Sequence, residues 1–253
     1  MLGSMNSKFW LMSFCVFLAM SCQKKLGLAW TGEEGKKVVE QFRSQERPPV
    51  SARINALTSQ GGFNAELYLE PAATVLGVVY GYTPLGQSLF EFELQGKNFL
   101  LLDFLASRAY SNNRDWLVDG AKDGFLQAQD QMLFWLIQVL LSLAGEIEAP
   151  TEFSRSPAGF VVAKARSGNY EINYFFRPAS ARLERMEIGK NSLEMTFEFA
   201  YREDCWFPGR IFVKNSGFKA SLQTIQLLCP QGLRPQMNFS VPQGFSQVLL
   251  TAP

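Results

Sequence analysis

The segment Leu193-Glu-Met-Thr-Phe-Glu-Phe-Ala-Tyr201 alternates apolar and polar side chains along its whole length. Successive side chains of a β-strand point to opposite faces of the sheet, so this pattern predicts a strand with one buried face. Half-buried strands of this kind are typical of antiparallel sheets. Met195, Phe197 and Phe199 should therefore face the interior, whereas the opposite face should hold Glu194 and Glu198.

The same alternation recurs along the chain. Phe90, Phe92 and Leu94 alternate with Glu91 and Glu93, and the stretch 63–70 follows the same rule. Turn-forming residues separate further predicted strands at 50–57, 76–82, 97–103, 159–166, 169–176, 182–189, 210–214 and 218–228. Some 10 to 11 strands without crossover helices between them indicate a meandering antiparallel sheet that curls on itself. We expect a mainly β (α+β) fold in a single domain.

Two helices interrupt the strands. Glu33–Arg43 is amphipathic, with Thr31 as its expected N-cap. Ala121–Ala144 is apolar on most of its surface, and its polar side chains form a narrow stripe that includes Gln138 and Ser142. This helix is either a core element inside the curl of the sheet or a lid that touches a lipid. Its interior residues are expected to share one interior with those of the strands: Trp135, Leu136, Val139 and Leu140.

Composition excludes several classes of function. The 253 residues carry 24 Lys and Arg against 23 Asp and Glu, so no basic surface for nucleic acid is expected. The chain has no His, which excludes a Ser-His-Asp triad and a His-liganded metal. We also find no carboxylate pair and no Ser-Lys arrangement at a recognisable spacing. We therefore expect no enzyme activity, no metal and no cofactor.

The N-terminus has the pattern of an export signal. Lys8 precedes the apolar run Phe9–Met20, which is too short to span a bilayer, and Ser21 and Cys22 follow. The last residues of this segment resemble the lipobox of bacterial lipoproteins, in which the cysteine becomes the acylated first residue. By that resemblance the chain divides into a signal peptide at 1–21, a lipid-anchored tether at 22–33 and one domain at 34–253. A secreted protein or an uncleaved anchor is the alternative.

Two cysteines remain for the mature domain. Cys205 and Cys229 flank a predicted hairpin, in which 210–214 and 218–228 meet at the turn Asn215-Ser216-Gly217. Their midpoint falls on this turn, so the two sulfur atoms should lie near each other across the strands. An exported protein is in a compartment that permits disulfides. We favour a disulfide over two free thiols.

A tight turn at Thr83-Pro84-Leu85-Gly86-Gln87 is the sharpest local feature. Pro at the second position and Gly at the fourth suit a reversal between strands. This geometry would place Leu85 at the tip, pointing away from the sheet. A single exposed apolar residue is common in itself, so the turn alone does not assign a role to Leu85.

The residues around this turn resemble the LolB family of outer-membrane lipoprotein receptors. The likeness covers most of residues 35–228, and its compact motif is Pro84-Leu85-Gly86. It continues in the order of the segments that follow: Leu89 to Leu94, Gly96-Lys97-Asn98, Leu102-Asp103, Arg108-Ala109-Tyr110 and an apolar helix that ends at Leu143-Ala144-Gly145. The soluble carrier LolA shares the fold but lacks the protruding loop, so Cys22 and Leu85 favour the anchored receptor.

This resemblance implies an incomplete antiparallel β-barrel whose concave side is closed by helices around an apolar cavity. The cavity would take the acyl chains of lipoproteins, delivered by a periplasmic LolA-like carrier, and the loop Pro84-Leu85-Gly86 would enter the membrane. Gln23 follows Cys22 where lipoproteins of the inner membrane have Asp, which implies an anchor in the bacterial outer membrane, facing the periplasm. We expect the protein to be a monomer. The alternative is a lipoprotein of this fold that binds lipid or a protein partner without inserting cargo.

Overall fold

The computed structural model describes residues 32–58, 61–72, 74–113, 128–190, 193–202, 205–214, 219–228 and 239–249. The predicted signal peptide, Cys22, the cap Thr31 and Cys229 lie outside these ranges. The fold statements below concern the described part of the chain.

The described strands form one 14-stranded sheet. Its first half contains β1 (Val50–Thr58), β2 (Gly61–Glu70), β3 (Leu76–Tyr82), β4 (Ser88–Gln95), β5 (Asn98–Asp103) and β6 (Arg108–Asn113). Its second half contains β7 (Glu152–Arg155), β8 (Val161–Ser167), β9 (Tyr170–Arg177), β10 (Arg182–Lys190), β11 (Leu193–Tyr201), β12 (Pro208–Lys214) and β13 (Lys219–Leu228), and β14 (Ser246–Leu249) completes the sheet. The expected mainly β, open-barrel fold is confirmed.

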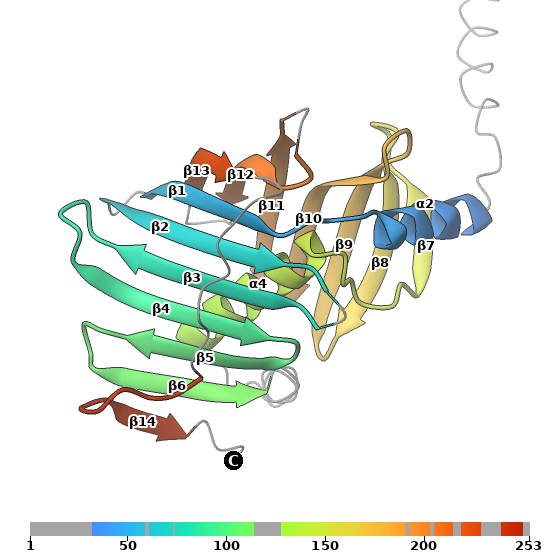
Figure 1. Cartoon of the computed structure of the whole chain (residues 1–253). Helices are drawn as coiled ribbons and strands as arrows, with labels where there is room; N and C mark the ends of the chain where they lie inside the picture. Colours follow the sequence, from blue (N-terminus) through green and yellow to red (C-terminus); the bar gives the residue numbers. More distant parts are fainter. Residues whose placement is uncertain are drawn as a thin grey trace, which may run out of the picture.

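Each half of the sheet is an antiparallel meander. The chain runs from β1 outward to β6, crosses to β7 at the far edge, and returns strand by strand to β13, which pairs with β1. The expected hairpin of β12 and β13 is present, with Lys214 opposite Lys219. The two meanders are therefore joined at the β1–β13 ladder, and Figure 1 shows that the joined sheet is strongly curled.

Helix α4 (Ala128–Leu143) lies on the concave side of this curl (Figure 1). The start predicted for it, 121–127, lies outside the described residues. Phe134, Ile137 and Leu141 are fully buried, and so are Gln138 and Ser142 of the expected polar stripe. Ser142 Oγ lies 3.5 Å from the sulfur of Met186 on β10, so even this side of the helix packs against the sheet. No helix among the described residues has the length and apolar character needed to cross a bilayer.

Close packing positions α4 against the first half of the sheet. A Cβ atom at Gly77 would lie 3.6 Å from Leu69 and Leu94 and 3.8 Å from Leu140, so this glycine of β3 lies directly below the helix. The helix ends at Gly145, which has a φ of +97°. There the N–H of Glu146 donates to the carbonyl of Leu141, as in a Schellman C-cap.

Helix α2 (Gly32–Ser44), predicted at Glu33–Arg43, packs over β7 and β8. Its buried residues Val39 and Phe42 point to the core, and the ring of Phe42 lies 4.9 Å from that of Phe176. The guanidinium group of Arg47 packs on the ring of Phe42. It also lies against Gly145, in the space that a Cβ atom at this residue would occupy. The start of the domain is thereby attached to the C-terminal end of α4.

The sheet has more strands than the predicted 10 to 11. The additional strands β6, β7 and β14 are short, and none has a clear alternation of apolar and polar residues. The strand β14 pairs with β6 in parallel, with Gln247 opposite Ala109, so the sheet is not antiparallel throughout. Pairing of these short strands depends on distant parts of the chain, which is why local periodicity did not identify them.

The predicted inside–outside register of β4 is correct, but the outer face is not simply open to water. Glu93 lies on the face opposite Phe92 and is only 3% exposed. On this face Leu100, Leu102 and Ala109 form a second apolar cluster, against which Phe104 and Phe245 pack. The rings of these two phenylalanines contact each other edge to face, with their centroids 5.4 Å apart. The C-terminal segment thus covers the outer face at β5 and β6.

Truncation of α4 at its contact with the sheet tests this packing. Leu140→Ala should lower the free energy of unfolding by about 2–5 kcal/mol, because it leaves a cavity over Gly77. Leu105→Ala is the matched control, since this leucine is exposed and its truncation should change stability by less than about 0.5 kcal/mol. Urea titrations of both variants measure the difference, and equal stabilities would contradict the central position of α4.

Candidate functional site

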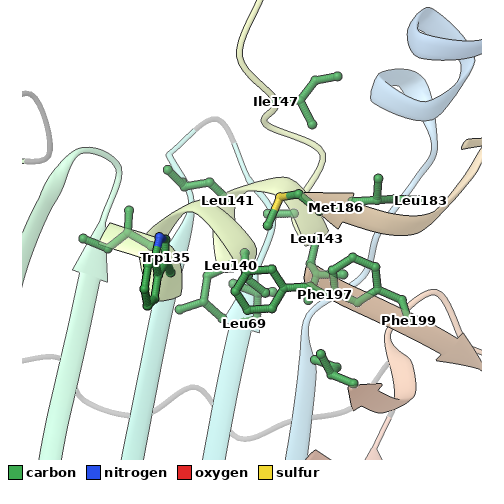
Figure 2. Close-up of a cluster of buried hydrophobic side chains, with 14 of the residues drawn as sticks. Leu69, Trp135, Leu140, Leu141, Leu143, Ile147, Leu183, Met186, Phe197 and Phe199 are labelled. Carbon is green, nitrogen blue, oxygen red and sulfur yellow. The ribbon is translucent and has the colours of Figure 1, made fainter. Parts of the chain in front are cut away.

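The interior of the curl is one large apolar cluster. It contains all the residues predicted to line a cavity: Phe92, Leu94, Trp135, Val139, Leu140, Met195, Phe197 and Phe199 are buried in it, and Phe90 and Leu136 are partly buried against it. Figure 2 shows that the cluster combines side chains of α4 with side chains of both halves of the sheet, Leu69 on one side and Phe197 and Phe199 on the other. These ten residues therefore share one interior, and their role as the lining of a lipid cavity stays a prediction.

Aromatic side chains supply much of this interior. The rings of Phe92 and Phe99 are stacked with their centroids 6.5 Å apart, and the ring of Phe134 stacks on Tyr170 at 4.5 Å. Phe90 lies so close to Gly81 that a Cβ atom there would meet its ring at 2.2 Å. Only a glycine at this position of β3 allows Phe90 to lie flat on the strand. Flat, apolar surfaces of this kind suit hydrocarbon chains and offer them no directional chemistry.

One polar atom in the interior is exceptional. The indole Nε1 of Trp135 is buried and has no hydrogen-bond partner within the described part of the chain. Trp206 shows the usual arrangement, in which Nε1 donates to the carbonyl of Pro48 at 2.9 Å. Sequence analysis identified Trp135 as an interior residue but could not foresee an unused donor there.

The turn between β3 and β4 presents Leu85 to solvent. Leu85 is 98% exposed. Around it, the N–H of Thr83 donates to the carbonyl of Gln87 at 2.8 Å, the N–H of Gly86 donates to that of Thr83 at 2.9 Å, and the N–H of Gln87 donates to Thr83 Oγ1 at 3.1 Å. Gly86 has a φ of +84°, which explains the glycine at this place. The turn is well bonded, and its apolar tip makes no packing contribution to the core.

Two more leucines are exposed at the same edge of the sheet. A row of paired residues crosses the first meander: Ile54, Ala65, Gly81, Phe90, Asp103 and Arg108. Beyond this row lie Leu57, which is 59% exposed, and Leu105 in the β5–β6 turn, which is 68% exposed. Leu57, Leu85 and Leu105 therefore belong to three successive hairpins at one edge (Figure 1), and we call this the leucine edge.

Sequence analysis found Leu85 but missed Leu57 and Leu105. An apolar residue next to a polar turn was the available signal, since Leu57 precedes Thr58-Ser59-Gln60 and Leu105 lies within Asp103 to Ser107. Near this edge, exposed Arg108 on β6 lies opposite Asp103, and exposed Lys219 begins β13. Exposed apolar side chains at one edge are suited to contact with a lipid surface.

The outer face behind the leucine edge carries tyrosine and glutamate. Tyr80 pairs with Glu66 on β2 and with Glu91 on β4, and Arg53 Nε donates to Glu66 Oε1 at 3.0 Å. Burial, followed by the charges of Glu91 and Glu93, raises the pKa of Tyr80 to about 12. Burial and the charge of Glu93 also raise the pKa of Glu91 above its usual range. The fold therefore favours the neutral forms of Tyr80 and Glu91.

Cys205 is buried between β11 and β12, where its sulfur accepts a hydrogen bond from the N–H of Phe207 at 3.4 Å. Its predicted partner Cys229 lies outside the described residues, so the disulfide stays a prediction. Among the described residues there is no cluster of three or more His, Cys, Asp or Glu side chains able to hold a metal ion.

Solved structures share this fold. A domain from Vibrio parahaemolyticus that is named for outer-membrane lipoprotein sorting superposes with a TM-score of 0.58 over 81% of this chain and 95% of its own, at 12% identity. A DUF1329 family protein from Desulfovibrio piger gives a TM-score of 0.56 over 80% of this chain and 94% of its own, at 9% identity. No protein-family model and no curated protein matches the sequence. The chain shares its open-barrel fold with these two structures, and at these identities the likeness defines the fold alone.

Titration of Tyr80 tests the electrostatics of the outer face. The fold favours the neutral form of Tyr80. The contribution of Tyr80 to the free energy of unfolding is therefore fully present below its unfolded pKa near 10, and it is lost as the pH rises through about 12. Burial also raises the pKa of Tyr82, Tyr170 and Tyr201, so several tyrosines titrate late. Tyr80→Phe should therefore reduce the late tyrosinate absorbance step, and Glu91→Gln should move part of it to lower pH. A late step that is unchanged in the Gln variant would show that Glu91 does not act on Tyr80.

Proposed function

We propose that the protein is a lipoprotein of the bacterial outer membrane that takes acyl chains of lipoproteins into its concave interior and inserts them into the membrane. The observation that carries this proposal is the fully exposed Leu85 on a well-bonded turn. Packing gives no reason to keep a branched aliphatic side chain there, because it contacts nothing in the domain. Entry into a hydrocarbon phase supplies a reason.

The interior supports the acyl-binding part of the proposal. Each methylene of an acyl chain costs about 0.8 kcal/mol to expose to water, so a receiving protein must offer a continuous apolar surface. The cluster around α4 extends across both meanders and is apolar and aromatic almost throughout. Cavity-lining roles for Phe92, Trp135, Leu140 and Phe197 follow from this proposal.

The leucine edge supports the delivery part. Leu57, Leu85 and Leu105 are on three successive hairpins, so a flat membrane surface can touch all of them at once. Acylation of Cys22 would hold the domain at the membrane, with the tether giving it freedom to turn this edge toward the bilayer. A soluble LolA-like carrier in the periplasm would then hand cargo to a monomeric receptor.

The second candidate is a lipoprotein of the same fold that binds lipid or a protein partner without insertase activity. The well-packed interior favours it, because α4 fills the curl with side chains such as Phe134 and Leu141. A lipid-binding form of this candidate also predicts acyl binding, whereas only the receptor transfers cargo into a membrane.

Leu85→Glu separates the two candidates. The glutamate should leave folding unchanged, since the side chain packs on nothing, and should abolish transfer of an acylated protein into liposomes because a charge is costly to take out of water. Ile225→Glu is the matched control, since Ile225 is also exposed but lies on β13 away from the leucine edge. Melting temperature, binding of the acylated protein and transfer rate should be measured for all three proteins. A well-folded Leu85→Glu variant that transfers cargo at the wild-type rate excludes the insertion role.

Cys22→Ala tests the anchor. If Cys22 is acylated, the wild type should incorporate labelled palmitate and partition into the detergent phase, whereas the alanine variant should do neither. Absence of label on the wild type would refute lipidation at this residue. Delivery by the Leu85 loop could still be measured on the unanchored domain with liposomes.

A further inference from the structure

Trp135 carries a buried donor that the protein does not use. The side chain is 9% exposed, and its Nε1 is buried with no acceptor in the described part of the chain. Buried indole N–H groups usually have a partner, as Trp206 does with the carbonyl of Pro48. Leaving such a donor unsatisfied costs about 1–3 kcal/mol of stability. A cost of this size inside the proposed binding region calls for an explanation in terms of function.

The surroundings of Trp135 identify what can satisfy it. Trp135 belongs to the same apolar cluster as Val139 and Leu140, and Figure 2 shows it on the other side of the cluster from Phe197 and Phe199. A buried water molecule usually needs two to four polar partners, which an apolar cluster does not provide. A single acceptor attached to a hydrocarbon chain fits better, because the chain occupies the apolar surface while the acceptor meets the N–H.

We propose that the indole N–H of Trp135 donates a hydrogen bond to the ester carbonyl of a bound acyl chain. This inference rests on the proposed function. It adds that one hydrogen bond fixes the position of the bound acyl chain along α4. Hydrocarbon contacts alone allow a chain to slide, since they are nearly the same at every depth. The donor therefore makes the interior selective for acyl chains over plain hydrocarbon chains.

Matched lipids with ester-linked and ether-linked chains test the donor. Wild-type protein should bind a synthetic diacyl lipopeptide about 3- to 10-fold more tightly than its diether counterpart, which is the range of one neutral hydrogen bond. Trp135→Phe should remove this preference, so that the variant binds the ester-linked and ether-linked probes with equal affinity. The same pair of probes built on phosphatidylethanolamine shows whether the acyl carbonyl of a lipoprotein or that of a phospholipid is the ligand.

The melting temperature of the ligand-free protein gives a second measurement, in which Trp135→Phe and Trp206→Phe should have different effects. Trp135→Phe removes an unsatisfied donor, so the melting temperature should change little or rise, whereas Trp206→Phe removes a satisfied bond and should lower it. Trp206→Phe should also keep the ester preference. If Phe at position 135 impairs folding, benzothienylalanine at this position keeps the shape of the ring and replaces only the N–H.

The outcomes separate this inference from the proposed function. Loss of the ester preference in the Trp135 variants, with diether binding retained, supports the hydrogen bond. Equal wild-type affinity for ester and ether probes overturns the hydrogen bond and leaves the acyl-binding function standing. Failure of the wild type to bind any of the probes overturns the proposed function and this inference together.

Discussion

The architecture depends on one constraint, which is that α4 is apolar on nearly its whole circumference and must be covered on all sides. A flat sheet covers one side of a helix, so a single sheet can cover this one only by curling around it. The chain order makes the curl possible, because α4 lies between β6 and β7, the last strand of the first meander and the far edge of the second. The meanders then close on each other through β1 and β13.

The same construction separates the two surfaces that the proposed function needs. In an antiparallel meander the hairpin turns alternate between two edges, so β1–β2, β3–β4 and β5–β6 place their turns at one edge. The interior is formed by side chains between these edges and faces α4. Apolar residues at the turns, such as Leu85, are therefore exposed without weakening the core, and hydrophobic binding inside and hydrophobic contact outside can be specified independently.

Period-two alternation made much of the fold predictable, because it is a local property of the chain. It identified the inward-facing residues of β4 and β11, such as Phe92 and Phe197, and the helix pattern identified Trp135 and Leu140 as interior. What it could not identify arises between distant segments. The parallel pairing of β14 with β6, the burial of Glu93 and the meeting of three exposed leucines at one edge all depend on the assembled sheet. The unsatisfied Trp135 donor is likewise a property of packing, since any tryptophan at this position looks the same in the sequence.

A core built only for stability would use phenylalanine or leucine where α4 has Trp135, because an apolar ring avoids the burden of a buried donor. Ser142 of the same helix has a partner within the protein, because its Oγ lies 3.5 Å from the sulfur of Met186. Trp135 Nε1 is different, because the described fold offers it no acceptor. The central helix therefore packs well through its apolar side chains, but one of its hydrogen-bond donors has no acceptor in the described fold. The carbonyl of the proposed acyl ligand would supply the acceptor that this donor lacks.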